Sequence, residues 1–93
     1  MPRITVNDLR ATVNRINRVT GSPEEPYTKD ADGRFRANVG NYHLSQAYGG
    51  YSMHRMATDG GGVSEPLSTG HIPARDLYER MHAFLRGWEA RSA

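Results

Sequence analysis

The spacing of hydrophobic residues changes twice along this 93-residue chain, and these changes limit what it can fold into. Near the start, four apolar residues follow one another at intervals of three and four positions, namely Val6, Leu9, Val13 and Ile16. This is the pattern of an amphipathic helix. In the middle, apolar residues occupy every second position, as in a strand with one buried face. Near the end the longer interval returns, so the sequence predicts an α+β protein with a helix towards each end.

Both predicted helices have recognisable ends. The first spans about 6–20. Thr5 stands at its N-cap with Asp8 three positions later, which completes a capping box, and Gly21 stands where helices commonly stop. The second spans about 73–90 and starts at a proline, a favoured first helical residue. Its apolar stripe consists of Leu77, Met81, Phe84, Leu85 and Trp88.

Residues 33–57 alternate between apolar and polar side chains around two short turns, which predicts an antiparallel meander of three strands. A Gly-Asn turn would let Val39 pair with Tyr42. A Gly-Gly turn would place Tyr48 opposite Tyr51. Two helices packed on one face of this meander would complete a two-layer structure.

The rest of the chain is predicted to be connecting structure. A fourth strand is expected at an edge of the sheet, near Tyr27 or near Val63. Residues 59–70 form a Gly-rich loop with three consecutive glycines, Gly60–Gly62. A chain of this length has room for one compact domain, so we expect a single domain over 1–93.

The composition limits the chemistry. No cysteine is present, which excludes a disulfide scaffold, a thiolate nucleophile and a zinc site that needs sulfur. Only Lys29 among the 12 basic residues is a lysine, which suits bidentate phosphate recognition by arginine but also the codons of a GC-rich genome. The formal net charge of +2 is weak for nucleic-acid binding. No stretch is apolar enough to span a membrane. We expect a cytoplasmic protein without a cofactor, and a homo-oligomer because the core is small.

Four histidines invite a metal or acid–base interpretation. On the predicted strands His43 and His54 project from one face, away from the core, but no Asp or Glu alternates with them, so we expect no metal site. The triplet His43-Leu44-Ser45 has the form of one half of a two-histidine phosphoesterase motif, and the second half is missing. His71 is predicted to be a loop residue and His82 a helix-surface residue. The sequence therefore predicts a protein that is not an enzyme and has no catalytic residues.

The outward face of the predicted sheet gathers guanidinium, imidazole, hydroxyl and aromatic groups, which suits a phosphorylated ligand that carries a base or a sugar. The same side chains also suit an ordinary solvated sheet face. Arg55 shares the core-side face in the predicted register, so it must reach the sheet edge or find a buried partner. The predicted ligand-binding residues are Arg34, Arg36, His43, Tyr48, Tyr51, His54 and Arg55.

Several segments carry a resemblance to known proteins. They are RANVGNYHL (Arg36–Leu44), AYGGYSMHRM (Ala47–Met56), DGGGVS (Asp59–Ser64) and GHIPARDLYERMHAFLRGWE in the last helix. With these segments the chain resembles a group of small proteins of tailed bacteriophages, over most of its length. The resemblance implies a phage gene product that acts in the host bacterial cytoplasm, in host takeover or anti-defence. Some small phage proteins of this kind sequester cyclic-nucleotide or ADP-ribose-derived immune signals, and others block a defence nuclease by binding it.

Three functional hypotheses follow. The leading one is a non-enzymatic phage-type accessory protein that sequesters a small phosphorylated nucleotide-type ligand, such as a host immune signal. The first alternative is a protein–protein inhibitor of a host defence complex, which would use the Leu85 and Trp88 end of the last helix or an exposed strand edge. The second alternative is nucleic-acid binding. It would use the polar face of the first helix, formed by Asn7, Arg10, Asn14, Asn17 and Arg18.

Overall fold

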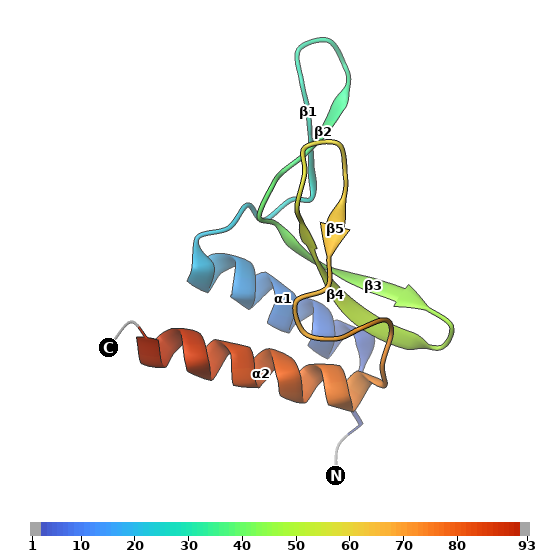
Figure 1. Ribbon diagram of the computed structural model, residues 1–93, viewed down its shortest axis with the longest axis vertical. Coiled ribbons are helices and arrows are strands. Elements are labelled where there is room, and N and C mark those ends of the chain that lie inside the picture. The colour runs from blue at the N-terminus through green and yellow to red at the C-terminus, as the bar shows by residue number, and fades with distance from the viewer. Residues whose placement is uncertain (1–2, 92–93) are drawn as a thin grey trace.

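The computed structural model describes residues 3–91 and shows an α+β fold. The elements in chain order are helix α1 (Val6–Thr20), strands β1 (Tyr27–Lys29), β2 (Phe35–Ala37), β3 (Tyr42–Ala47), β4 (Gly50–Met56) and β5 (Val63–Ser64), and helix α2 (Ala74–Arg91). The two helices lie side by side, β3 and β4 cross over them, and β1 and β2 project away from this body (Figure 1).

Both predicted helices are present. The capping box at the start of α1 is complete, because the Asp8 backbone N donates to Thr5 Oγ1 over 3.2 Å and the Thr5 backbone N donates to Asp8 Oδ2 over 2.8 Å. Gly21 ends α1 with a φ of 71°, the left-handed conformation that glycine adopts without strain. Neither helix, over residues 3–91, is long and apolar enough to cross a membrane.

The predicted meander is wrong in its first strand. β2 pairs with β1 in a separate two-stranded sheet, and Val39 does not pair with Tyr42. The residues of the expected Gly-Asn turn bond to β4 instead. The Gly40 backbone N donates to the Met56 carbonyl, and the Met56 backbone N donates to the Asn41 carbonyl, each over 2.8 Å. These bonds extend the β3–β4 pairing and leave β2 to find another partner.

The hairpin of β3 and β4 forms, with its register shifted by two residues from the prediction. Ala47 lies opposite Gly50. The turn consists of Tyr48 and Gly49, at φ 54° and 74°, and two positive φ values are what the favoured two-residue hairpin turn requires. Tyr48 is therefore in the turn and not opposite Tyr51. Because a shift of two positions keeps each residue on its side of the sheet, the predicted faces are retained.

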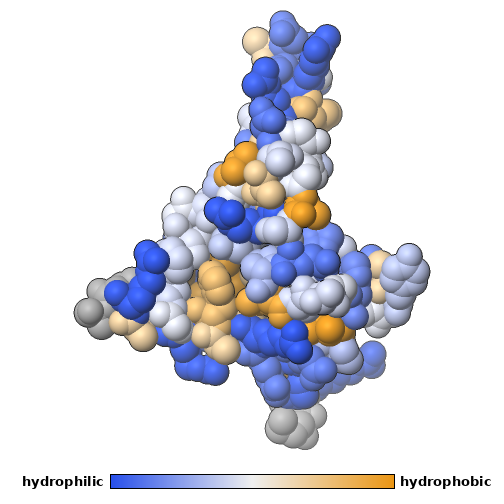
Figure 2. Space-filling view, viewed as in Figure 1, coloured by the Kyte–Doolittle hydropathy of each residue, from blue (hydrophilic) through white to orange (hydrophobic). Residues whose placement is uncertain are grey.

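β1, β2 and the turn between them form a projecting hairpin, which we call the β-arm (residues 27–37; Figure 1). Its turn is closed by Asp30, whose Oδ1 accepts two backbone N–H hydrogen bonds of 2.9 and 3.0 Å. Phe35 is 70% exposed and lies on the same face of the arm as Tyr27. Apolar patches interrupt the hydrophilic surface of the arm and its base (Figure 2). Of the two predicted edge-strand positions, the one near Val63 is β5, which pairs with β4.

The core lies between the helices and the inner face of β3 and β4. α1 supplies Leu9, Val13 and Ile16, the strands supply Tyr42 and Met53, and α2 supplies Leu77, Met81 and Leu85. Leu85 is buried, and Trp88 is half-buried with its ring stacked on Phe84 at 6.2 Å. This end of α2 is therefore mostly used within the fold, and Tyr27 and Phe35 on the β-arm are among the exposed large apolar residues.

Asn17 fixes strand β3 on helix α1. It is 1% exposed, so the prediction that it belongs to an exposed polar face is wrong. Its Nδ2 donates to the Tyr42 carbonyl over 2.9 Å, and the Tyr42 backbone N donates to Asn17 Oδ1 over 2.8 Å. Because β3 is the edge strand of its sheet, these two bonds occupy backbone groups that another strand would take. The other polar α1 residues named above, Asn7, Arg10, Asn14 and Arg18, are exposed.

Candidate functional site

Four aromatic rings form a row on the face of β3 and β4 that points away from the helices. The ring centroids are 6.4 Å apart from Tyr48 to His71, 6.1 Å from His71 to His54, and 5.6 Å from His54 to His43. Neighbouring ring planes are inclined by 63–78°, so each ring meets its neighbour edge to face. We call these four residues the ring row.

Strand pairing places two of the rings. His43 and His54 are direct cross-strand partners, and Ser45 lies opposite Ser52 one step further along the same face. The prediction that His43 and His54 share this outward face is confirmed. Tyr48 stands at the tip of the hairpin and is fully exposed. The row therefore runs from the tip of the hairpin to the middle of the sheet.

The fourth ring comes from an edge segment, residues 65–72, which follows the edge of β4 beyond β5. Ile72 and Tyr51 exchange two backbone hydrogen bonds of 2.8 Å, which pin this segment to the sheet. A glycine at position 50 allows the close approach, because a Cβ there would lie 3.1 Å from the Ile72 carbonyl oxygen and 3.2 Å from His71 atoms. The edge segment thereby brings His71 up to the ring row.

A buried hydroxyl anchors the start of the edge segment. Ser52 is fully buried, and its Oγ donates to Glu65 Oε2 over 2.8 Å, while the Gly70 backbone N donates to the same oxygen over 3.1 Å. The hydrogen bond from Ser52 is the main cause that lowers the pKa of Glu65, and the charge of His54 lowers it further. Glu65 Oε2 is also 3.8 Å from His54 Nε2. The ring row therefore has one carboxylate beside it, already engaged in holding the segment.

The protonation of His43 follows from its neighbours. Asn41 donates through Nδ2 to the Pro23 carbonyl over 2.8 Å, so its Oδ1 is the atom that faces His43 Nδ1 at 3.2 Å. We therefore assign the proton of neutral His43 to Nδ1, which leaves a lone pair on Nε2. Burial lowers the pKa of His43, and the charge on protonated His54 lowers it further. At neutral pH His43 is a neutral base.

Two contributors to the site, His71 and Glu65, were not predicted from the sequence. His71 Nε2 lies 2.9 Å from Ser45 Oγ across 26 positions of sequence, and Glu65 reaches the face from the same edge segment. No periodicity reports the path by which a loop returns to a sheet, so spacing alone gave no signal for either. His71 was predicted to be a loop residue, which is correct, but its place in the ring row was not expected.

Four of the predicted ligand-binding residues lie away from the ring row. Arg34 and Arg36 are exposed on the β-arm, and Arg36 Nε is 3.6 Å from Asp30 Oδ2. The β-arm carries both away because β2 pairs with β1 and not with β3. Tyr51 lies on the opposite, helix-facing side of the sheet, where it packs against the core. Only His43, Tyr48 and His54 are brought together.

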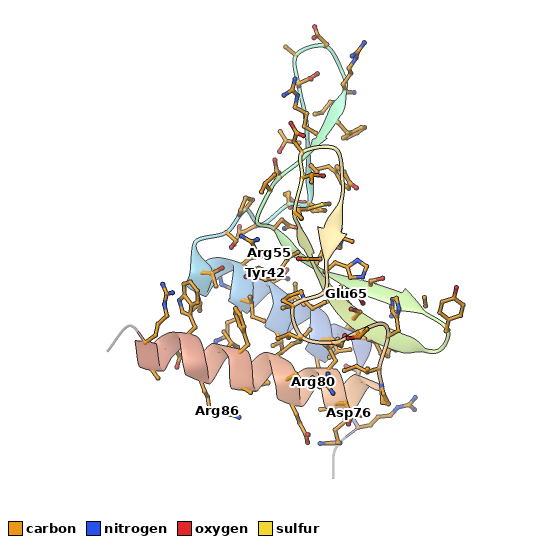
Figure 3. All side chains as sticks on the ribbon, viewed as in Figure 1. Tyr42, Arg55, Glu65, Asp76, Arg80 and Arg86 are labelled. Atoms are coloured by element: carbon orange, nitrogen blue, oxygen red, sulfur yellow. The ribbon has the colours of Figure 1, made fainter. Side chains whose placement is uncertain are left out.

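Arg55 was predicted to lie on the core-side face, where its charge needs a buried partner or a path to the sheet edge, and in the structure its side chain reaches the surface. It lies opposite Tyr42 in the register, on the core side, yet it is exposed. Its guanidinium carbon is 5.8 Å from the centroid of the Tyr42 ring, a cation–π contact. Figure 3 shows these two side chains next to each other, with Glu65 some distance away. Arg55 therefore belongs to the flank of the core and not to the ring row.

An open cavity of about 460 Å³ runs along the free edge of β3. It is lined by Arg10 and Asn14 of α1, by Glu24 and Glu25 of the connector, and by His43. His43 therefore borders both this cavity and the ring row.

The chemistry of the ring row is that of imidazoles, hydroxyls and one carboxylate. Within residues 3–91, no group of three or more His, Cys, Asp or Glu side chains is placed to hold a metal ion. In comparisons with known proteins, no family model, no curated protein and no solved structure matches this chain.

Proposed function

We propose that this chain binds a phosphorylated nucleotide-type ligand, whose bases stack on the ring row. The observation that carries the proposal is the row itself, with four rings at nearly even intervals on one sheet face. Aromatic side chains bind bases of any sequence, because every base has a π-face, and each stacked base contributes about 1–3 kcal/mol.

The spacing of the rings favours unstacked bases. Adjacent rings are 5.6–6.4 Å apart, nearly twice the roughly 3.4 Å rise between bases of one strand in a duplex. Bases that each contact their own ring therefore cannot also stay stacked on each other. A short single strand, a cyclic oligonucleotide or an ADP-ribose derivative meets this condition, whereas a duplex does not.

The conformation of Tyr48 supports the same proposal. An aromatic residue at φ 54° is strained by about 1–2 kcal/mol relative to residues that favour this turn. Burial of its ring does not offset this strain, since the side chain is fully exposed and its ring contact is with His71 at 6.4 Å. A ligand that stacks on the ring supplies a reason for placing tyrosine at the hairpin tip.

Phosphate groups have nearby donors. The imidazoles of the ring row donate when protonated, and Arg10 lies in the cavity that His43 borders. Because His43 is held neutral at pH 7, affinity for a phosphorylated ligand should rise as the pH falls and His43 becomes protonated. The resemblance of the sequence to small tailed-phage proteins favours a nucleotide signal of host defence as the physiological ligand, which the chain would sequester.

The first test is a thermal-unfolding scan against cyclic dinucleotides, short linear oligonucleotides, ADP-ribose and inorganic phosphate. A ligand at about a hundred times its dissociation constant stabilises the folded state by about 2.7 kcal/mol. In a domain of this size we expect the midpoint to rise by roughly 10 °C or more. A panel without any shift at low salt would overturn the proposal.

Two tyrosine variants test where the ligand sits. Tyr48→Ala removes one ring of the row, so it should weaken binding by roughly 5- to 100-fold, the equivalent of about 1–3 kcal/mol of stacking. Tyr27→Ala is the matched control, because Tyr27 is a half-exposed tyrosine on the β-arm. Equal affinity of the Tyr48→Ala and Tyr27→Ala proteins would place the ligand elsewhere.

A second candidate function is the binding of a protein partner through the β-arm. Phe35 is 70% exposed, and with Tyr27 it lines an apolar hollow of about 380 Å³. Exposed aromatic residues of this kind are typical anchors of protein interfaces. Phe35→Ser should abolish capture of a bacterial protein while nucleotide binding stays unchanged. Capture that survives Phe35→Ser would exclude the arm as the interface.

A further inference from the structure

We propose that His43 and His54 cleave RNA bound on the ring row, by transferring the scissile phosphate to the adjacent 2′-hydroxyl. The inference rests on the proposed nucleotide binding and adds a reaction to it. It arises from the pairing of the two strands. The phosphoesterase-like triplet that contains His43 lacked a second catalytic group in the sequence, and the fold places His54 directly across from it.

His43 has the form of a general base. Its Nδ1 faces Asn41 Oδ1 at 3.2 Å, and the Asn41 amide is itself oriented by the Pro23 carbonyl. The free lone pair is therefore on Nε2. His43 also lines the open cavity beside β3, so a ligand can approach this residue from solvent. A base needs to be neutral, accessible and within hydrogen-bond reach of the proton it takes.

His54 has the form of a general acid. Its Nε2 is 3.8 Å from Glu65 Oε2, so the imidazolium form of His54 faces a carboxylate. The same carboxylate is fixed by Ser52 and by the Gly70 backbone, and so it cannot swing away from the ring row. The two strands thus hold the His54 imidazole beside a carboxylate and the His43 imidazole beside the Asn41 amide. This asymmetry assigns the base to His43 and the acid to His54.

The reaction needs no other reactant. His43 Nε2 takes the proton of the ribose 2′-hydroxyl, and the O2′ electron pair forms a bond to phosphorus. The bond from phosphorus to O5′ of the next nucleotide breaks, and O5′ receives the proton of the His54 imidazolium. The products are a 2′,3′-cyclic phosphate and a free 5′-hydroxyl. The ring centroids are 5.6 Å apart, close enough for both imidazoles to contact the oxygens of a single phosphodiester.

The test incubates the full chain with a short RNA of mixed sequence in the presence of EDTA and identifies the products by mass spectrometry. We expect fragments that end in a 2′,3′-cyclic phosphate. The variants His43→Gln and His54→Gln should each lower the cleavage rate by about 100-fold or more, the usual contribution of a general acid or base. The control is His82→Gln, which removes a histidine of α2 that contacts Tyr78 and lies outside the row. It should leave the rate unchanged.

Two further readings separate the reaction from the binding. The all-deoxy counterpart of the RNA lacks the nucleophile, so it should bind with similar affinity and remain intact. The rate should fall on the acid side as His43, the base, is protonated. If the DNA binds but RNA is not cleaved, or is cleaved equally by all the variants, the reaction is refuted and the binding proposal stands. If neither nucleic acid binds and no RNA is cleaved, the reaction is refuted, and the cyclic dinucleotides and ADP-ribose of the thermal-unfolding scan decide the binding proposal.

Discussion

Replacing Asn17 with alanine tests how strand β3 is held on helix α1. The side chain is 1% exposed and makes two hydrogen bonds, of 2.8 and 2.9 Å, to the backbone of Tyr42. Alanine would leave the Tyr42 N–H and carbonyl buried without these partners. Each such group costs about 1–3 kcal/mol, and the higher helix propensity of alanine returns at most about 0.7 kcal/mol. We expect the free energy of unfolding to fall by about 2–5 kcal/mol.

A urea titration followed by circular dichroism measures this loss, and the slope of the transition should stay constant. A loss of this size is a large part of the roughly 5–15 kcal/mol that stabilises a typical domain. It should also lower the thermal midpoint by roughly 10 °C or more.

Asn14 provides the matched control, since it lies one turn earlier on α1 and is exposed. Asn14→Ala gains the same helix propensity and breaks no buried bond, so its stability should stay within about 0.5 kcal/mol of the unchanged chain. A loss of less than about 1 kcal/mol in Asn17→Ala would refute the reasoning, because it would mean that the Tyr42 backbone groups find other partners.

The remaining predictions concern the ring row and the buried histidines. Gly50→Ala places a Cβ 3.1–3.2 Å from the edge segment, so the free energy of unfolding from a urea titration should fall by about 1–2 kcal/mol. The imidazole NMR resonance of His71 in that segment should shift as well. Gly49→Ala, at φ +74° with nothing within 4 Å, should cost about 1 kcal/mol and leave that resonance in place; the same shift in both would contradict the close contact. Burial lowers the pKa of His43 and of His82, so as the pH falls the unfolded chain takes up protons before the folded chain does. The contribution of these two groups to the free energy of unfolding should be full above pH ~6.5 and should be lost as the pH falls through the lowered pKa values. His82→Gln should flatten this fall in urea midpoints, and an unchanged slope would show that the His82 imidazole is accessible. Tyr48→Asn should raise stability by about 1–2 kcal/mol, because asparagine tolerates positive φ, while nucleotide binding measured by thermal unfolding weakens. An Asn variant that binds as well as the tyrosine would remove the case for stacking.

The parts of the fold that follow from local chemistry were predictable. The ends of α1 depend on Thr5, Asp8 and Gly21, which act within a few residues of their own positions. The shared face of His43 and His54 was also predictable, because alternation along a strand survives a register error of two residues. In both cases the sequence contains the whole cause.

Strand partners were not predictable in this way. Gly40 and Asn41 have the composition of a hairpin turn, yet their backbone groups bond to Met56 of β4. Gly49 and Gly50 also look alike in the sequence, but Gly49 supplies a positive φ for the turn and Gly50 supplies space for the edge segment. The local sequence indicates which residues are able to form a turn or to allow a close approach of another backbone. Only the competition between distant partners decides which role each one takes.

The exceptions to local rules gather around the ring row. Tyr48 adopts a positive φ, a Cβ at position 50 would lie 3.1 Å from a neighbouring backbone, and Ser52 is a fully buried hydroxyl that donates to Glu65. A hairpin selected only for stability would place asparagine at the tip and an apolar side chain at the buried position. Three such departures within five residues, all beside the same row of rings, are therefore better explained by a requirement on that face than by independent accidents of folding. The requirement that fits all three is a fixed set of imidazoles next to an exposed aromatic ring, which is what a nucleotide ligand needs and the core does not.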